Sequence, residues 1–83
     1  MMIDTGDTVK HDPTGETWVV AYVKGKYLSP CGWPECEALL SHCTLIEKAS
    51  DEERLDLLRR LAEIPNLDAR GRYARERLGI MEV

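Results

Sequence analysis

Three cysteines and two histidines are the side chains of this sequence that are best suited to bind a metal ion. A tetrahedral zinc site would use Cys31, Cys36 and Cys43, with His42 or His11 as the fourth ligand. The spacing gives this site little support, because the first two cysteines have four residues between them and a second closely spaced ligand pair is missing. Cysteines without metal are commonly buried as small apolar side chains. We therefore expect no cofactor, with a zinc-stabilised module as the alternative.

A cysteine and a histidine could also act as a nucleophilic pair. That chemistry needs a third group that orients the histidine and a cleft that holds the substrate. Neither is recognisable in a chain of 83 residues. The sequence therefore favours a protein that is not an enzyme.

The segment Cys-Gly-Trp-Pro-Glu-Cys at 31–36 is too rich in Gly and Pro to continue a strand and predicts a shaped loop. Trp33 in this loop either closes one end of the core or projects from the surface. A projecting Trp33 would form an aromatic surface with Tyr27, Pro30 and Pro34, of the kind that anchors partner proteins. The sequence thus indicates an unidentified protein partner that is bound at this surface.

Arginines concentrate in the last part of the chain, and four of them could contact nucleic acid: Arg70, Arg72, Arg75 and Arg77. Arginine has a planar fork that suits phosphate. However, residues 50–83 hold seven arginines and eight acidic residues, so this region has a net charge of −1. That balance favours a solvated, salt-bridged helical face, and nucleic-acid binding remains the alternative.

Short β-strands must position the loop and the cysteines. Apolar and β-branched runs bounded by Gly-containing and Pro-containing turns predict strands at 8–11, 17–23, 27–29, 38–40 and 43–47. Strands this short and close together predict a small closed or half-closed β-barrel of four to five antiparallel strands, covering residues 5–48. The fold class is α+β, because helical patterns follow.

The strand at 17–23 is apolar at nearly every position, so both of its faces need cover. Simple alternation predicts one face with Trp18, Val20 and Tyr22 and an opposite face with Val19, Ala21 and Val23. We expect the curled sheet to enclose one set and the carboxy-terminal helices to cover the other.

Two helices are predicted after the strands, at 50–64 and 68–79. Ser50 and Glu53 form a capping box at the first start, and Gly79 terminates the second helix. The apolar stripes contain Leu55, Leu57, Leu58, Leu61 and Ala62 in the first helix, and Tyr73, Ala74 and Leu78 in the second. Gly71 should weaken the second helix by about 1 kcal/mol relative to Ala. Residues 1–83 thus form a single domain with a helical hairpin packed on a barrel.

The composition of the chain further narrows the class of protein to which it could belong. The chain has no Phe, and its net charge is −4. The negative charge disfavours a general nucleic-acid binder, because phosphate binding needs an excess of basic groups. The first residues lack the features of a signal peptide, and no window is apolar enough to span a membrane. We expect a cytoplasmic protein without membrane contact.

The order of several motifs resembles short uncharacterised proteins of bacteriophages and prophages. The motifs are Gly6-Asp7-Thr8-Val9, Pro13-Thr14-Gly15-Glu16, the run from Trp18 to Val23, the run from Cys31 to Glu35, and Cys43-Thr44-Leu45-Ile46. This resemblance covers residues 6–53 and implies a small accessory factor without a transferable activity. The opening strand and hairpins are also similar to SH3-like barrels of the KOW type, which is an analogy of fold alone.

Overall fold

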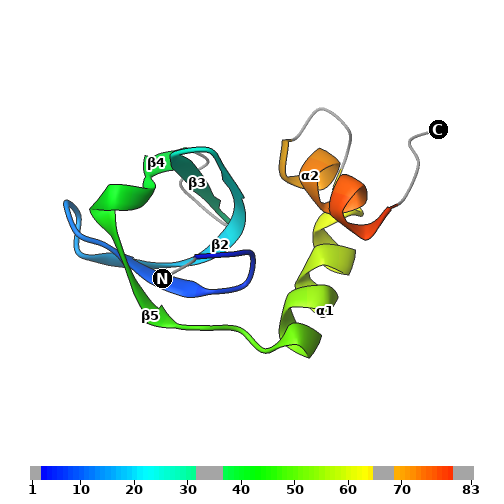
Figure 1. The fold of residues 1–83 in the computed structure, drawn as a ribbon, viewed down its shortest axis with the longest axis horizontal. Helices are drawn as coiled ribbons and strands as arrows, with labels where there is room; N and C mark the ends of the chain where they lie inside the picture. The colour runs from blue at the N-terminus through cyan, green and yellow to red at the C-terminus, as the bar shows by residue number, and fades with distance from the viewer. Residues whose placement is uncertain (1–2, 32–36, 65–68, 80–83) are drawn as a thin grey trace.

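The computed structural model describes residues 3–31, 37–64 and 69–79, and its architecture is α+β (Figure 1). The elements in chain order are β1 (Thr8–His11), β2 (Glu16–Lys24), β3 (Tyr27–Pro30), β4 (Ala38–Leu39), the 3-10 turn η1 (Leu40–His42), β5 (Cys43–Glu47), α1 (Asp51–Leu61) and α2 (Ala69–Leu78). The strands agree with their predicted ranges to within one residue at each end. No helix in the described ranges is both long and apolar enough to cross a membrane.

The strands form one antiparallel sheet in the order β4-β3-β2-β1-β5. The turn between β1 and β2 closes as predicted: Gly15 has a φ of 73° and its amide donates to the carbonyl of His11 at 2.7 Å. Glycine reaches such positive φ values without strain. The sheet curls strongly in Figure 1, but among the described strands β4 and β5 are not paired, so the sheet is open.

A change of register inside β2 decides which residues face the helices. Val20 pairs with Pro30 while Tyr22 pairs with Ser29, so Ala21 is an extra residue on β2, as in a β-bulge. The bulge turns the strand over by one position, and Tyr22 joins Ala21 on the helix side. Our expectation that Tyr22 shares a face with Trp18 and Val20 is therefore wrong.

The other predicted face of β2 is corrected for the same reason. Val23, which follows the bulge, packs against the cluster inside the sheet, whereas Val19 is 44% exposed. The expected grouping of Val19, Ala21 and Val23 on one covered face is thus wrong as well.

Two separate apolar clusters cover β2 on its two sides. The inner cluster lies within the curl of the sheet and consists of Val9, Trp18, Val20, Leu28 and Ala38. The outer cluster joins the sheet to the helices and consists of Ala21, Tyr22, Leu58, Leu61 and Ala74. The expectation that β2 is enclosed by the sheet on one side and by the helices on the other is confirmed.

Helix α1 begins with the predicted capping box, in which the Ser50 side chain accepts from the amide of Glu53 and the Glu53 side chain accepts from the amide of Ser50. Its buried positions are Leu58 and Leu61. Leu55 is 41% exposed, so its assignment to the apolar stripe is wrong. The polar side chain of Arg54 instead lies under α1, against the amino-terminal segment.

Helix α2 ends at the predicted glycine, Gly79, which has a φ of 75°. Gly71 has a role that its helix propensity does not suggest. A Cβ atom at this position would lie 2.5 Å from the carbonyl oxygen of Ile64, so only glycine lets the end of α1 and the start of α2 approach this closely.

Candidate functional site

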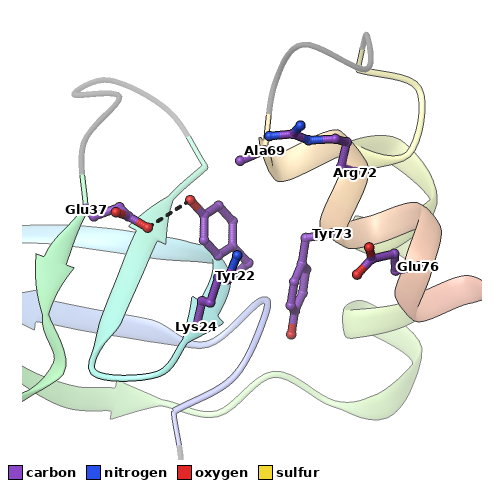
Figure 2. A pocket seen from close by; sticks show the side chains of 7 residues that line it. All are labelled: Tyr22, Lys24, Glu37, Ala69, Arg72, Tyr73 and Glu76. Atoms are coloured by element: carbon purple, nitrogen blue, oxygen red, sulfur yellow. Dashed lines mark hydrogen bonds between the residues drawn. The ribbon is translucent and has the colours of Figure 1, made fainter.

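A pocket of about 680 Å³ lies between the sheet and α2 (Figure 2). Its volume falls within the range of about 300 to 1,000 Å³ that is usual for ligand sites. The sheet wall carries Tyr22, Lys24 and Glu37, and the helix wall carries Ala69, Arg72, Tyr73 and Glu76. The pocket therefore joins residues that are far apart in the sequence.

Two tyrosines form the apolar part of the pocket. The rings of Tyr22 and Tyr73 are tilted by 33°, with their centroids 5.4 Å apart. Tyr22 is only 6% exposed, and its hydroxyl donates to Oε2 of Glu37 at 3.2 Å. The hydroxyl of Tyr73 points out of the pocket and accepts from Nη1 of Arg77 at 3.1 Å. Each tyrosine is thus held at its hydroxyl and presents its ring to the interface.

Four exposed charged side chains surround these rings: Lys24, Glu37, Arg72 and Glu76. Each wall has one positive and one negative charge, so the formal charges of the lining residues cancel. The side chains of Lys24, Arg72 and Glu76 make no hydrogen bond or ion pair with any described residue. These charges are therefore available to a ligand.

The charges of α2 follow the helix dipole only in part, through Arg75 and Arg77 in its last turn. In α1, acidic residues occupy the first turn and arginines the last turn, which is the favourable order. Helix α2 has no acid in its first turn; Arg72 lies in its first half and Glu76 in its second half. A basic residue placed four positions before an acidic one is the weaker orientation for helix stability. Stabilisation of α2 does not explain why Arg72 and Glu76 occupy these positions.

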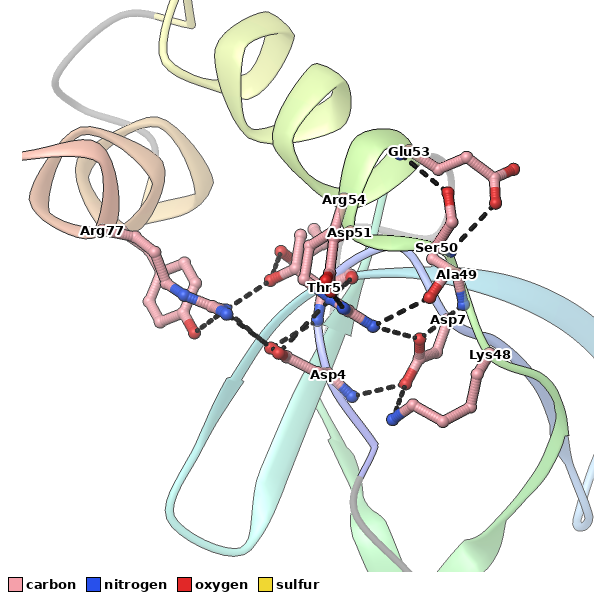
Figure 3. A network of polar contacts seen from close by, with 12 residues as sticks. Asp4, Thr5, Asp7, Lys48, Ala49, Ser50, Asp51, Glu53, Arg54 and Arg77 are labelled. Atoms are coloured by element: carbon pink, nitrogen blue, oxygen red, sulfur yellow. Dashed lines mark hydrogen bonds and ion pairs between the residues drawn. The ribbon is translucent and has the colours of Figure 1, made fainter.

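The same sheet–helix interface carries a second polar feature, an ion-pair network that consists of Asp4, Asp7, Lys48, Arg54 and Arg77 (Figure 3). Both helices contribute an arginine to it, and the amino-terminal segment contributes the carboxylates. Arg54 also donates through Nε to the carbonyl of Thr5 at 2.9 Å. The network therefore fastens α1 and α2 to the segment that leads into β1.

Asp7 is the fully buried member of this network. Its carboxylate accepts from Nζ of Lys48 at 3.0 Å, from the amide of Ala49 at 2.9 Å, from Nη2 of Arg54 at 2.9 Å and from the amide of Asp4 at 2.9 Å. Burial alone would raise the pKa of Asp7, but these donors outweigh it and hold the pKa below its ordinary value. Asp7 is therefore ionised at neutral pH and is fully partnered.

Asp4 connects the network to α2. Both terminal nitrogens of Arg77 donate to its carboxylate, at 2.6 and 2.8 Å. This bidentate contact lowers the pKa of Asp4 and raises the pKa of Arg77. Because Arg77 also donates to Tyr73, the ring that lines the pocket is attached to the network.

The aromatic surface predicted around the 31–36 loop is only partly described. Trp33 and Pro34 lie outside the described residues. Tyr27 is 45% exposed, as a surface residue should be. Pro30 is fully buried next to β2, so it is not available to a partner and its assignment to the binding surface is wrong.

The predicted metal ligands are distributed over two sides of the sheet. Cys31 packs against the outer cluster and Cys43 against the inner cluster, and both are free thiols. Burial raises the pKa of both thiols. His42 is exposed in η1, and Cys36 lies outside the described residues. Within the described ranges, no three His, Cys, Asp or Glu side chains are grouped to hold a metal ion.

Three of the four arginines proposed to contact nucleic acid make contacts within the chain. Arg70 donates to the carbonyl of Cys31 at 2.8 Å, and Arg77 binds Asp4. Arg75 donates through Nη1 to the carbonyls at the end of α1, those of Ala62 at 2.8 Å and Ile64 at 2.7 Å. Of these four arginines, Arg72 lies exposed at the pocket and makes no such contact with the residues that the structure describes.

The residues that make the pocket and the network were not among the sequence candidates, with the exception of Arg72 and Arg77. The sequence predicts Tyr22 as a core residue of the strand at 17–23, and it gives Asp4 and Asp7 no role in a site. One signal was present in the sequence: the order of Arg72 and Glu76, which opposes the helix dipole.

Comparison of the chain with models of protein families, with curated proteins and with solved structures finds no match.

Proposed function

We propose that this chain is a small, non-enzymatic interaction module that binds a segment of a protein partner in the pocket between the sheet and α2. The observation that carries the proposal is the rim of the pocket, where Lys24, Arg72 and Glu76 are exposed, without partners among the described residues, around two fixed tyrosine rings. Aromatic residues and arginine are the side chains most often found at the centre of binding surfaces.

A protein ligand suits this pocket better than nucleic acid does. Phosphate recognition requires an excess of basic groups, whereas the charges lining the pocket cancel. In addition, Arg70, Arg75 and Arg77 already donate to groups of this chain. For these reasons nucleic-acid binding stays an alternative to the leading proposal, as does a zinc-stabilised module.

The predicted Trp33 surface belongs to the same proposal. The loop that carries Trp33 begins at Cys31, whose carbonyl accepts from Arg70 of α2, and ends at Glu37, which lines the pocket. A ligand in the pocket would therefore lie next to the Glu37 end of this loop, and we propose that Trp33 and Tyr27 extend the binding surface.

We further propose an SH3-like assignment for the sheet and a role as a cytoplasmic accessory factor of the phage or prophage type. Five short antiparallel strands, a 3-10 turn before the last strand and the return of β5 to the side of β1 support the SH3-like assignment. The motifs in residues 6–53 support the assignment as an accessory factor of the phage or prophage type. An experimental structure in which the sheet is flat, so that its edge strands β4 and β5 lie far apart, would contradict the fold assignment.

Selection from a library of random heptapeptides tests the binding function. Peptides selected by the wild-type protein should bind at least threefold more weakly to the Arg72→Ala/Glu76→Ala variant, because both exposed charges of the helix wall are lost. The matched control is Arg59→Ala/Glu63→Ala, which removes the same charges from exposed positions outside the pocket lining. Failure to select any peptide, or equal weakening by the control, would refute the proposal.

A further inference from the structure

We infer that the ligand of this pocket is an extended peptide segment with an acidic and a basic side chain two positions apart. The inference rests on the proposed function, because it assumes that a protein segment occupies the pocket. It names the chemistry of that segment from the charges of the two walls.

The charge pattern excludes ligands of a single sign. Lys24 and Arg72 attract a carboxylate, while Glu37 and Glu76 repel it, and the converse holds for a cation. The pocket as a whole therefore gives no long-range preference to either sign. A ligand gains from all four charges only if it carries both signs and places each beside its opposite.

The spacing of the charges suits an extended chain. Arg72 and Glu76 are four residues apart on α2, so their Cα atoms are separated by about 6 Å along the helix. In an extended strand, side chains two positions apart lie on one side and are separated by about 6.6 Å. An acidic residue and a basic residue at positions i and i+2 would thus reach Arg72 and Glu76 together.

The residue between the two charged positions would face the sheet wall. That wall presents the ring of Tyr22 between Lys24 and Glu37, and the ring of Tyr73 lies in contact with it (Figure 2). An apolar side chain at i+1 would pack at the accessible edge of this pair of rings, in which Tyr22 is buried and Tyr73 is half-buried. The recognised pattern is therefore charged, apolar, oppositely charged.

The helix itself supplies an independent argument for this role. Arg72 and Glu76 stand in the order that the helix dipole disfavours, and neither has a partner among the described residues. Exposed charges that add little to the stability of the helix, on the wall of a pocket, are explained if they meet opposite charges of a ligand.

Capped heptapeptides provide the probe. Acetylated and amidated Gly-Ser-Glu-Leu-Lys-Ser-Gly, and the same peptide with Glu and Lys exchanged, are titrated against the ¹⁵N-labelled protein and followed by NMR. The comparison peptides contain Glu-Leu-Glu, Lys-Leu-Lys, or Glu and Lys at adjacent positions. We expect a mixed peptide with the i, i+2 spacing to bind about threefold more tightly than any comparison peptide, and to shift the amides of the pocket.

Charge reversal makes the test specific to the helix wall. Glu76→Arg should make Glu-Leu-Glu the preferred peptide, and Arg72→Glu should make Lys-Leu-Lys the preferred peptide. The matched controls, Glu63→Arg and Arg59→Glu, change the net charge equally and should retain the preference for the mixed peptide. All four positions are exposed, and unchanged thermal melts will show that the variants fold.

The outcomes separate this inference from the proposed function. Peptides that bind in the pocket without regard to charge pattern, or controls that change the preference, would overturn the inference and leave the binding function standing. Absence of binding by every peptide, including those from the random library, would overturn both. Equal amide shifts with free leucine would assign the pocket to a small zwitterion and would overturn the peptide assignment.

Discussion

The ion-pair network and the pocket lie at the same interface between sheet and helices, but their charged side chains differ in burial and in pairing. In the network, every carboxylate has several donors, and Asp7 is fully buried. At the pocket, three of four charged side chains have no partner among the described residues. Burial with full pairing is what holds a structure together, whereas exposed unpaired charge contributes little to stability. The network is therefore expected to hold the helices in place, and the pocket is free to serve a ligand.

Removal of Asp7 should have the largest effect on stability, because Asp7 is the fully buried carboxylate of the network. Asp7→Ala leaves Lys48, Arg54 and the amide of Ala49 without their buried acceptor. We expect a loss of about 3 kcal/mol in the free energy of unfolding, measured by urea denaturation. Asp7→Asn retains one acceptor oxygen and should lose less. A loss below about 1 kcal/mol for Asp7→Ala would show that the network is not the main fastening of the helices.

Acid should weaken the ion-pair network by less than Asp7→Ala does, because a protonated carboxyl still accepts hydrogen bonds. The pKa values of Asp4 and Asp7 are lowered in the folded protein, so their stabilisation is present above the unfolded value of about 3.9. It is lost as the pH falls through the folded pKa values. Urea midpoints measured from pH 7 to pH 2 should therefore fall most steeply below about pH 4.

The Asp4→Asn variant is the control for this titration, since it removes one of the two groups. Its urea midpoint should depend less on pH than that of the wild type. Equal pH dependence in both proteins would mean that other carboxylates account for the acid loss.

Gly71→Ala tests the packing of the helical hairpin that forms one wall of the pocket. Alanine gains about 1 kcal/mol in helix propensity over glycine. Its Cβ would meet the carbonyl of Ile64 at 2.5 Å, and such overpacking costs about 1 to 3 kcal/mol. We expect a net destabilisation of about 1 kcal/mol by urea denaturation. Net stabilisation would show that α1 and α2 do not approach this closely.

The smallest effect is expected at the pocket. Arg72→Ala and Glu76→Ala should each change the free energy of unfolding by less than about 0.5 kcal/mol, because neither side chain is buried or is paired with another described residue. The measurement is again urea denaturation, beside the binding tests described above. A loss above about 1 kcal/mol from either variant would place that residue with the network as a structural group.

Local signals accounted for most of the elements. Turn residues such as Gly15 and the capping box at Ser50 act within a few positions, and the structure has the hairpin and the start of α1 at the predicted places. Helix α1 ends at Leu61, however, so the predicted end at residue 64 is wrong. The position of α2 also followed from a terminating glycine at 79. The short strand β4 was placed by a weaker pattern, and the structure retains it as two residues, Ala38–Leu39.

The candidate site could not be predicted in the same way, because it depends on contacts between distant parts of the chain. The bulge at Ala21 arises from the pairing of β2 with β3 and moves Tyr22 to the outer side. Asp4 and Asp7 find their donors on residues that follow β5, such as Lys48 and Arg54. No periodicity or spacing within one segment contains that information.

Because of the extra residue in β2, this one strand contributes buried side chains to both the inner and the outer cluster. Deletion of Ala21 would restore regular alternation and turn Tyr22 inward, toward a cluster that already holds Trp18 and Val20. The helical hairpin would lose its aromatic anchor in the same step. One inserted position in the backbone thus joins the two halves of this molecule, and its loss would uncouple them without the removal of a single charged group.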